Sequence, residues 1–192
     1  MSYVTDSIDS RIIKLLKNGA VGFMPSDTIY GLSCRALDEP AVKRLHALKD
    51  RGAHKPFIVL ISDMKMLDLL SISYNEVITA EKYWPGPLNL ICRAPAAPGW
   101  LSLDTQSLAI RIPANKELQK LIRQTGPLVS TSANPGGKPP ASSVAAAKKY
   151  FGDKLDFYVD IGEVETVPST LVKVENGKLV VVREGTVKLN DT

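Results

Sequence analysis

The sequence predicts a single α/β domain, in which helices pack on a twisted mixed β-sheet that also forms a basic concave groove. Segments with helical periodicity alternate with short apolar runs rich in β-branched residues. The last two such runs flank Asn176-Gly177, a strong signal for a β-hairpin. The chain of 192 residues is 44% hydrophobic and has no repeat or linker, so one core can form. We therefore expect one domain over residues 1–192, with its core at about 8–186.

Periodicity and capping residues define the elements of the first half. Apolar side chains recur on one face of the first helical segment, and Gly19 is suited to end it. Asp38 can cap the next helix, and Pro40 suits its first turn. The run FIVLI is apolar throughout, which is typical of a strand buried on both faces. The expected elements are a helix at 7–18, a strand at 20–24, a helix at 39–49 and a strand at 57–61.

The second half continues the alternation and then closes with the hairpin. Ser73 and Glu76 have the spacing of a capping box, which predicts a helix that stops before Pro85. Asn115 is suited to cap a later helix. The expected elements are a helix at 73–83, strands at 88–92 and 108–112, a helix from 115 to about 124, a strand at 127–130, a helix capped by Ser142 or Ser143 that runs to Tyr150, and hairpin strands at 170–174 and 178–183.

Charge and hydropathy limit the classes of protein that fit. The 24 basic and 20 acidic residues give a net charge of +4, which favours anionic ligands only mildly. A nucleic-acid-binding protein of this size usually shows a larger excess or a known module. No apolar run approaches the roughly 20 residues of a membrane span. The N-terminus is amphipathic and has early acids, unlike a signal peptide, so we expect no membrane association and a cytoplasmic protein.

The few cysteine and histidine residues do not predict a metal site or a catalytic thiol. Cys34, Cys92, His46 and His54 lack the close-pair spacings of zinc ligands. Cysteine and histidine outside such motifs are usually core or surface residues. We therefore expect no dedicated metal site on the protein.

Two polar clusters follow predicted strands, where open α/β sheets bind ligands. The first, PSDTIYGL, offers Ser26, Asp27, Thr28 and Tyr30. Its alternative interpretation is a turn whose side chains bond its own backbone. The second, STSANPGG at 130–137, could cradle a phosphate with hydroxyls and backbone N–H groups, and its alternative is a flexible hydrophilic turn.

Basic residues form two further candidate sites. Lys49, Arg51 and Lys55 fall in one loop and repel each other unless an anion such as a polyphosphate lies among them. The alternative is a solvated loop, and no GxxxxGK[ST] motif is present. Arg111, in LAIRIP, is costly to bury unless paired; it could bind a carboxylate or an internal acidic residue. Arg183 and Ser169-Thr170, at the ends of the hairpin, are weaker signals of the same kind.

Taken in order, these clusters resemble the YrdC-like family of threonylcarbamoyl-AMP synthases. The motifs are PSDTIYGL, KDR followed by KP, PGPLN, IRIP, STSAN, PSTLV and VVREG. The resemblance implies an enzyme that condenses L-threonine, bicarbonate and ATP into threonylcarbamoyl-adenylate, a nucleotidyl transfer that releases pyrophosphate. It implies Mg²⁺ entering with ATP, and a separate tRNA threonylcarbamoyl transferase complex that uses the adenylate for t6A at position 37 of tRNA.

The resemblance also implies roles for individual residues. Lys49, Arg51 and Lys55 would be catalytic and would hold the triphosphate. The implied ATP-binding residues are Arg51, Lys55, Ser107, Ser132, Asn134 and Arg183. The implied threonine-binding residues are Thr28, Arg111, Ser130 and Ser169.

Three departures from the family pattern are visible. Ser26 replaces the usual threonine and keeps a hydroxyl, whereas Asn89 replaces the threonine common after PGP and puts the role of that hydroxyl in doubt. The chain ends soon after Arg183, as in the short form that lacks an extra C-terminal domain. It keeps the Ser-Ala-Asn and Lys-x-Arg elements, which one relative loses; this favours an active synthase.

Two alternatives belong to other classes. One is an RNA-binding module that uses the same basic groove; the weak net charge and an aromatic content of 6% disfavour it. We expect direct tRNA binding to be weak at most. The other is a carbamoyl- or acyl-transfer domain for a different amino acid, which would differ only in the shape of its pocket.

Overall fold

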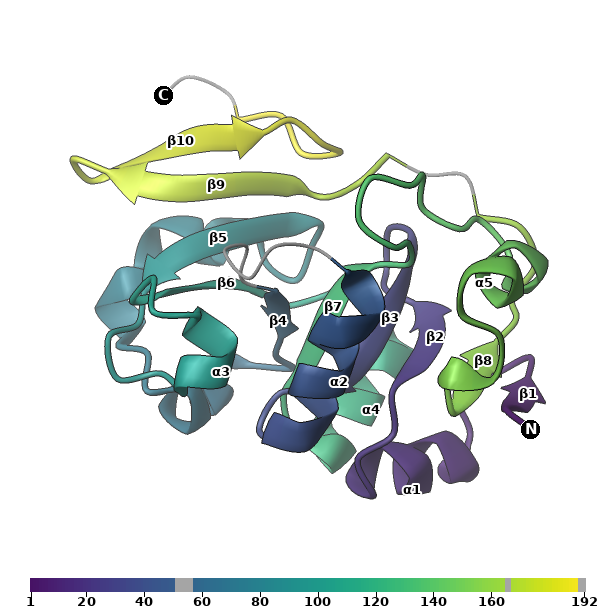
Figure 1. The fold of residues 1–192 in the computed structure, drawn as a ribbon. Coiled ribbons are helices and arrows are strands. Elements are labelled where there is room, and N and C mark those ends of the chain that lie inside the picture. The colour runs from purple at the N-terminus through teal and green to yellow at the C-terminus, as the bar shows by residue number, and fades with distance from the viewer. Residues whose placement is uncertain (51–56, 165–166, 190–192) are drawn as a thin grey trace.

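One mixed β-sheet runs through the molecule and carries helices on both faces (Figure 1). A computed structural model describes residues 1–50, 57–164 and 167–189. Within these residues the sheet order is β1-β8-β2-β3-β7-β4-β6-β5-β9-β10. The strands are β1 (Tyr3–Thr5), β2 (Gly22–Pro25), β3 (Tyr30–Arg35), β4 (Ile58–Leu60), β5 (Leu88–Arg93), β6 (Ser107–Arg111), β7 (Leu128–Ser132), β8 (Phe157–Val159), β9 (Thr170–Glu175) and β10 (Lys178–Arg183).

The sheet joins strands that are far apart in the sequence. Its centre, from β2 through β3 and β7 to β4, is antiparallel, and β4 then pairs with β6 in parallel. On one side β8 lies parallel between β1 and β2. On the other side β9 lies parallel to β5, and the hairpin to β10 completes the edge. The predicted mixed α/β architecture is confirmed.

Two apolar cores lie on opposite faces of the sheet. The larger core packs α2 and α5 against the strands, and the smaller packs α1 and α4 against the other face. In Figure 1, α2 and α3 lie in front of the sheet and α4 lies behind it. In the described part of the chain, no helix is both long and apolar enough to cross a membrane. The α-helices are α1 (Ser10–Lys17), α2 (Glu39–Lys49), α3 (Gly99–Ser102), α4 (Lys116–Thr125) and α5 (Val144–Phe151).

The capping signals in the sequence mark several true helix ends. The Asp38 carboxylate accepts from Ala41 N at 3.0 Å and begins α2. Asn115 caps α4 in the same way, and Ser143 rather than Ser142 caps α5. The hairpin turn has Asn176 and Gly177 at positive φ, as an Asn-Gly turn requires. The expected helix at 7–18 is shorter, because its cap is Asp9.

Several expectations about the elements were wrong. Residues 73–83 form 3₁₀ helices at Tyr74–Glu76 and Ile78–Tyr83, and Ser73 makes no side-chain cap. A further 3₁₀ helix, Met64–Leu70, was not expected. Strands β1, β3 and β8 and helix α3 were also missed. The strand expected at 127–130 extends to Ser132, so the first residues of STSAN belong to β7.

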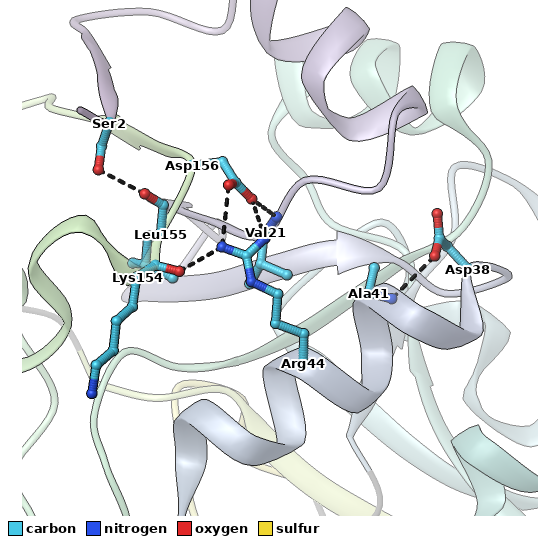
Figure 2. A network of polar contacts seen from close by, with 8 residues as sticks. All are labelled: Ser2, Val21, Asp38, Ala41, Arg44, Lys154, Leu155 and Asp156. Atoms are coloured by element: carbon cyan, nitrogen blue, oxygen red, sulfur yellow. Dashed lines mark hydrogen bonds and ion pairs between the residues drawn. The ribbon is translucent and has the colours of Figure 1, made fainter.

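An ion pair ties α2 to the start of β8 (Figure 2). Asp156 accepts from both terminal nitrogens of Arg44, at 2.6 and 3.1 Å, and from the backbone N–H of Val21 at 2.7 Å. Arg44 also donates to the carbonyl oxygen of Lys154 at 2.6 Å. One carboxylate therefore connects three segments that lie far apart in the sequence.

We expect Asp156→Ala to destabilise the protein by about 1–3 kcal/mol, because it leaves the N–H of fully buried Val21 without its acceptor. The partly exposed Arg44 pair adds little. Urea unfolding measures the change. Lys43→Ala, which breaks an exposed pair with Glu39, is the control and should cost under about 0.5 kcal/mol. Equal effects of the two variants would contradict this reasoning.

Candidate active site

A cavity of about 910 Å³ lies over one face of the sheet. Its floor is a row of side chains on neighbouring strands, in the order Ser130, Ile58, Ala109 and Ile91, placed side by side by the strand register. Its walls come from the β2–β3 turn, from residues 140–142 and from the terminal hairpin. A mostly apolar floor with a few polar groups at the edges is typical of a small-molecule site.

The β2–β3 turn forms one wall, and its conformation is fixed by its own side chains. Ser26 Oγ donates to the carbonyl oxygen of Ile29 at 2.7 Å, so the alternative interpretation of this cluster is correct for Ser26. Asp27, at a φ of 77°, accepts from the backbone N–H groups of Ala114 and Asn115 at 2.8 and 2.9 Å. These bonds hold Thr28 at the cavity wall.

Arg111 ends β6 and lines the cavity while only 2% exposed. One terminal nitrogen donates to the carbonyl oxygen of Ser26 at 2.5 Å, and Nε has no partner among the described residues. Burial lowers the pKa of Arg111 to about 10, with Asp27 opposing and Arg183 adding to the shift. The guanidinium therefore remains charged at neutral pH. A buried cation with an unpaired donor beside a cavity is suited to bind an anion.

The hairpin supplies a second arginine and a hydroxyl. Arg183 ends β10, is partly exposed, and donates to the carbonyl oxygen of Ser169 at 2.9 Å. Burial of part of the side chain lowers the pKa of Arg183. Ser169 lines the cavity and is 4% exposed, and its Oγ accepts from Asn89 Nδ2 at 2.5 Å. Two cationic side chains thus lie on the same cavity as Ser169.

Lys49 does not lie in a loop, because it is the last residue of α2. It is 2% exposed, and its ammonium donates to the carbonyl oxygen of Ser132 at 2.6 Å and to Asn134 Oδ1 at 2.9 Å. Ser132 Oγ donates to the same Asn134 oxygen at 2.6 Å. Asn134 Nδ2 donates to the carbonyl oxygen of Lys138 at 2.6 Å. Lys49 therefore anchors the segment that follows β7.

The cavity brings together most of the residues that the motifs indicated. Those that line it are Thr28, Ser107, Arg111, Ser130, Ser132, Ser169 and Arg183. Asn134 and Lys49 are not part of the lining and meet it through Ser132. Arg51 and Lys55 lie outside the described residues, so the predicted basic loop and the basic character of the groove stay predictions. No group of three His, Cys, Asp or Glu side chains in the described part of the chain could hold a metal ion.

Sequence reasoning missed other lining residues. Phe57, Ile91, Thr105, Ser142 and Val164 also border the cavity. The sequence gives no reason to distinguish Ile91 and Phe57 from core residues. An apolar residue of a strand occupies the same place in the hydrophobic pattern whether a ligand or a helix covers it. Thr105 lies between residues of positive φ, with Leu103 and Asp104 before it and Gln106 after it, a conformation that no sequence motif marked.

Comparison with known proteins assigns the chain to a family. A model of the Sua5–YciO–YrdC family, described as telomere recombination, matches residues 14–185. The chain belongs to this family. The match spans the β2–β3 turn, both arginines and the hairpin, so the family sequence covers every wall of the cavity.

Several proteins of known name or structure are similar to this chain in sequence or in fold. Threonylcarbamoyl-AMP synthase of Pyrococcus abyssi is 33% identical over 182 residues, covering 92% of this chain and 53% of the relative. The chain thus spans about half the length of that relative. The Pseudomonas aeruginosa synthase is 36% identical over 146 residues, covering 74% and 79%. The crystal structure of P. abyssi Sua5 complexed with L-threonine has a TM-score of 0.84 at 29% identity, covering 96% of this chain and 57% of that one.

Proposed function

We propose that this protein is a threonylcarbamoyl-AMP synthase, which condenses L-threonine, bicarbonate and ATP into threonylcarbamoyl-adenylate and pyrophosphate for t6A37 modification of tRNA. The observation that carries the proposal is the buried guanidinium of Arg111, with an unpaired Nε, on a cavity lined by hydroxyl side chains. Relatives of similar sequence are threonylcarbamoyl-AMP synthases, and one solved relative is complexed with L-threonine.

The amino acid fits the end of the cavity next to Arg111. Its carboxylate would pair with that guanidinium, because a planar fork of donors matches two carboxylate oxygens. Ser130, Thr28 and Ser169 would form further hydrogen bonds to the amino acid. The Ser130 and Thr28 hydroxyls both line the cavity, so they are available to a ligand.

The nucleotide would occupy the rest of the cavity. Ser107, Ser132 and Arg183 line it, and Asn134 supports Ser132. The apolar floor offers a surface for a base. Lys49, Arg51 and Lys55 would hold the triphosphate, Lys49 by way of the segment it anchors. Mg²⁺ would enter on the phosphate oxygens of ATP, where it neutralises charge during phosphoryl chemistry.

The chemistry needs positioning and charge neutralisation rather than a protein nucleophile. Threonine and bicarbonate give a carbamate and water; a carbamate oxygen then attacks the α-phosphorus and pyrophosphate leaves. Both reactants are anions, so cations fixed around the phosphates lower the barrier. Cys34 and Cys92 are buried, and burial raises both thiol pKa values, that of Cys92 to about 12. Neither thiol is therefore suited to covalent catalysis.

Direct binding of RNA to this protein would be weak and would not be needed for the reaction. Helices α1 and α4 carry six exposed cations that form no ion pair in the described part of the chain: Arg11, Lys14 and Lys17 on α1, and Lys116, Lys120 and Arg123 on α4. Such a surface supports weak, salt-sensitive contact with phosphates. A separate transferase complex would use the adenylate, and the protein would act in the cytoplasm.

Pyrophosphate release tests the proposal directly. The pure protein is incubated with Mg-ATP, bicarbonate and labelled threonine, with and without tRNA. We expect pyrophosphate and a labelled adenylate in both cases, because no step of the proposed reaction uses RNA. An absolute requirement for tRNA would instead favour an RNA-binding module, and no product in either case would exclude the synthase.

Amino-acid selectivity should rank threonine first, then serine, then valine. A site that hydrogen-bonds the side-chain hydroxyl rejects the isostere that lacks it, whereas a missing methyl group is worth only about 1–3 kcal/mol. Valine should therefore lose much more in kcat/KM than serine does. The ratio of kcat/KM values from pyrophosphate release measures this. Equal turnover of all three amino acids would point to a domain acting on a different substrate.

A further inference from the structure

Asn89 is a buried amide behind the cavity wall, on the same face of β5 as Ile91. Its Nδ2 donates to Ser169 Oγ at 2.5 Å and to the carbonyl oxygen of Thr170 at 3.3 Å. The carbonyl can only accept, so the atom facing both groups is the amide nitrogen and not the oxygen. The orientation of the Asn89 amide is therefore fixed by its surroundings.

This orientation determines what Ser169 offers to a ligand. Because Ser169 Oγ accepts from Asn89, its own O–H is left to donate in another direction. Asn89 Nδ2 is a donor and cannot accept that proton. Ser169 lines the cavity, so its proton can point toward a ligand there. The backbone carbonyl of Ser169 is meanwhile occupied by Arg183. Ser169 thus presents a hydrogen-bond donor to the cavity.

Asn89 and Arg111 lie next to each other across two strands. Leu90 pairs with Ile110 in antiparallel register, so Asn89 and Arg111 take the adjoining facing positions, with Cβ atoms roughly 5 Å apart. Asn89 Oδ1 and Arg111 Nε are both buried without a partner in residues 1–50, 57–164 and 167–189. Unpaired buried polar atoms are rare and require an explanation. A ligand carboxylate bound at this position would accept from Arg111 Nε and so supply the missing partner of that donor.

We propose that Asn89 is a positioning residue that fixes the Ser169 hydroxyl as a hydrogen-bond donor to the carboxylate of the amino-acid substrate, beside Arg111. The inference rests on the proposed function. Two donors from different strands, one charged and one neutral, then converge on a single anionic group. Asn89 itself touches Ser169 and not the substrate.

A double-mutant cycle tests the coupling. Asn89→Leu keeps the branched shape of the side chain and removes the amide, and Ser169→Ala removes the hydroxyl. We expect Asn89→Leu to raise the KM and the calorimetric Kd for threonine by about 10-fold, with a smaller change in kcat, because the Ser169 donor is no longer held in place. In the Ser169→Ala background the same substitution should add less than about twofold.

A purely structural role predicts a different result. The full effect of Asn89→Leu would then persist in the Ser169→Ala background, and that outcome overturns the proposal. Gln119→Leu, which removes another buried amide that donates to the carbonyl oxygen of Pro113, is the matched control and should leave the KM for threonine unchanged.

Asn89→Asp keeps the test decisive if the leucine variant does not fold. A carboxylate in place of the amide can only accept, so it would turn the Ser169 proton away from the cavity despite its nearly identical shape. We expect weaker threonine binding than in the wild type, and wild-type affinity would overturn the proposal. Threonine and valine should be weakened by the same factor, since both carry the carboxylate; an effect on threonine that is absent with valine, which lacks the side-chain hydroxyl, would place the bond on that hydroxyl and contradict the proposal.

Binding and turnover separate this inference from the function it rests on. If the wild-type protein binds threonine but releases no pyrophosphate, the synthase function fails, while the calorimetric cycle still decides the role of Asn89. If pyrophosphate release is normal and the cycle shows no coupling, only the role of Asn89 fails.

Discussion

Arg111→Met is expected to lower kcat/KM for threonine on the order of 10²- to 10³-fold while leaving the fold intact. The substitution removes the buried guanidinium, with its unpaired Nε, that would pair with the substrate carboxylate. The free energy of unfolding should stay within about 1 kcal/mol of the wild-type value or rise, because a desolvated cation next to Arg183 is replaced by an apolar chain. Pyrophosphate release at varied threonine and urea unfolding measure the two effects.

Two further variants sharpen this prediction. Arg111→Lys retains the charge but not the planar fork, so it should also be strongly impaired. Arg35→Met is the control: its guanidinium bonds backbone carbonyls of Thr125 and Lys17, away from the cavity, and its loss should leave kcat/KM nearly unchanged. Wild-type turnover in Arg111→Met, or a loss that follows only from unfolding, would contradict the assignment of this residue to the substrate carboxylate.

Gly185→Ala is expected to damage both the hairpin and the site. A Cβ at Gly185 would lie 2.3 Å from the carbonyl oxygen of Pro168 and 2.4 Å from backbone atoms of Ser169 and Thr170. Backbone atoms cannot move aside as a flexible side chain can, so the segment that carries Ser169 must shift. We expect a loss of about 1–3 kcal/mol in the free energy of unfolding and at least a tenfold rise in the KM for threonine.

Gly99→Ala is the matched control for this variant. A Cβ at Gly99 meets nothing within 4 Å, so the change should be nearly neutral for stability and for the KM. Thermal unfolding and steady-state kinetics on both variants measure the difference. If Gly185→Ala behaves like Gly99→Ala, the close approach of the two hairpin segments does not constrain the site.

The elements that sequence reasoning identified are those whose signals are local. Asp38, Asn115 and Ser143 each cap a helix through a bond to a backbone N–H within a few residues, and the Asn-Gly turn closes its own hairpin. Such signals depend on neighbouring residues alone, so they can be recognised without knowledge of the fold.

The missed elements depend on distant partners. Strands β1 and β8 have three residues each and exist because they pair with each other across the length of the chain. Strand β3 contains Gly31 and Ser33, which break the apolar pattern, and Gly31 is needed where Thr131 O would lie 3.0 Å from a Cβ. Residues 73–83 have helical periodicity, but they form 3₁₀ turns. Tertiary context overrides local preference in all of these segments.

The candidate site shows the same division. Arg111 and the hydroxyls of Thr28, Ser130 and Ser169 were predicted, because polar residues at strand ends stand out against apolar runs. The burial of Lys49 was not predicted, since its ammonium bonds a carbonyl 83 residues away. The orientation of Asn89 could not be predicted either, because it depends on a parallel strand that joins the sheet only at Thr170.

The parallel pairing of β9 with β5 also affects how the chain folds while it is being synthesised. Until Thr170 has been synthesised, β5 has no neighbour on one side, so the unfinished chain carries an open strand edge beside the apolar residue Ile91. Tyr30 is likewise tied to Gly162 only across 132 residues, and such non-local pairing makes folding slow. An open edge invites pairing with other chains. Changes in the last strands will therefore reduce the yield of folded protein during synthesis, even where the purified protein is as stable as the wild type.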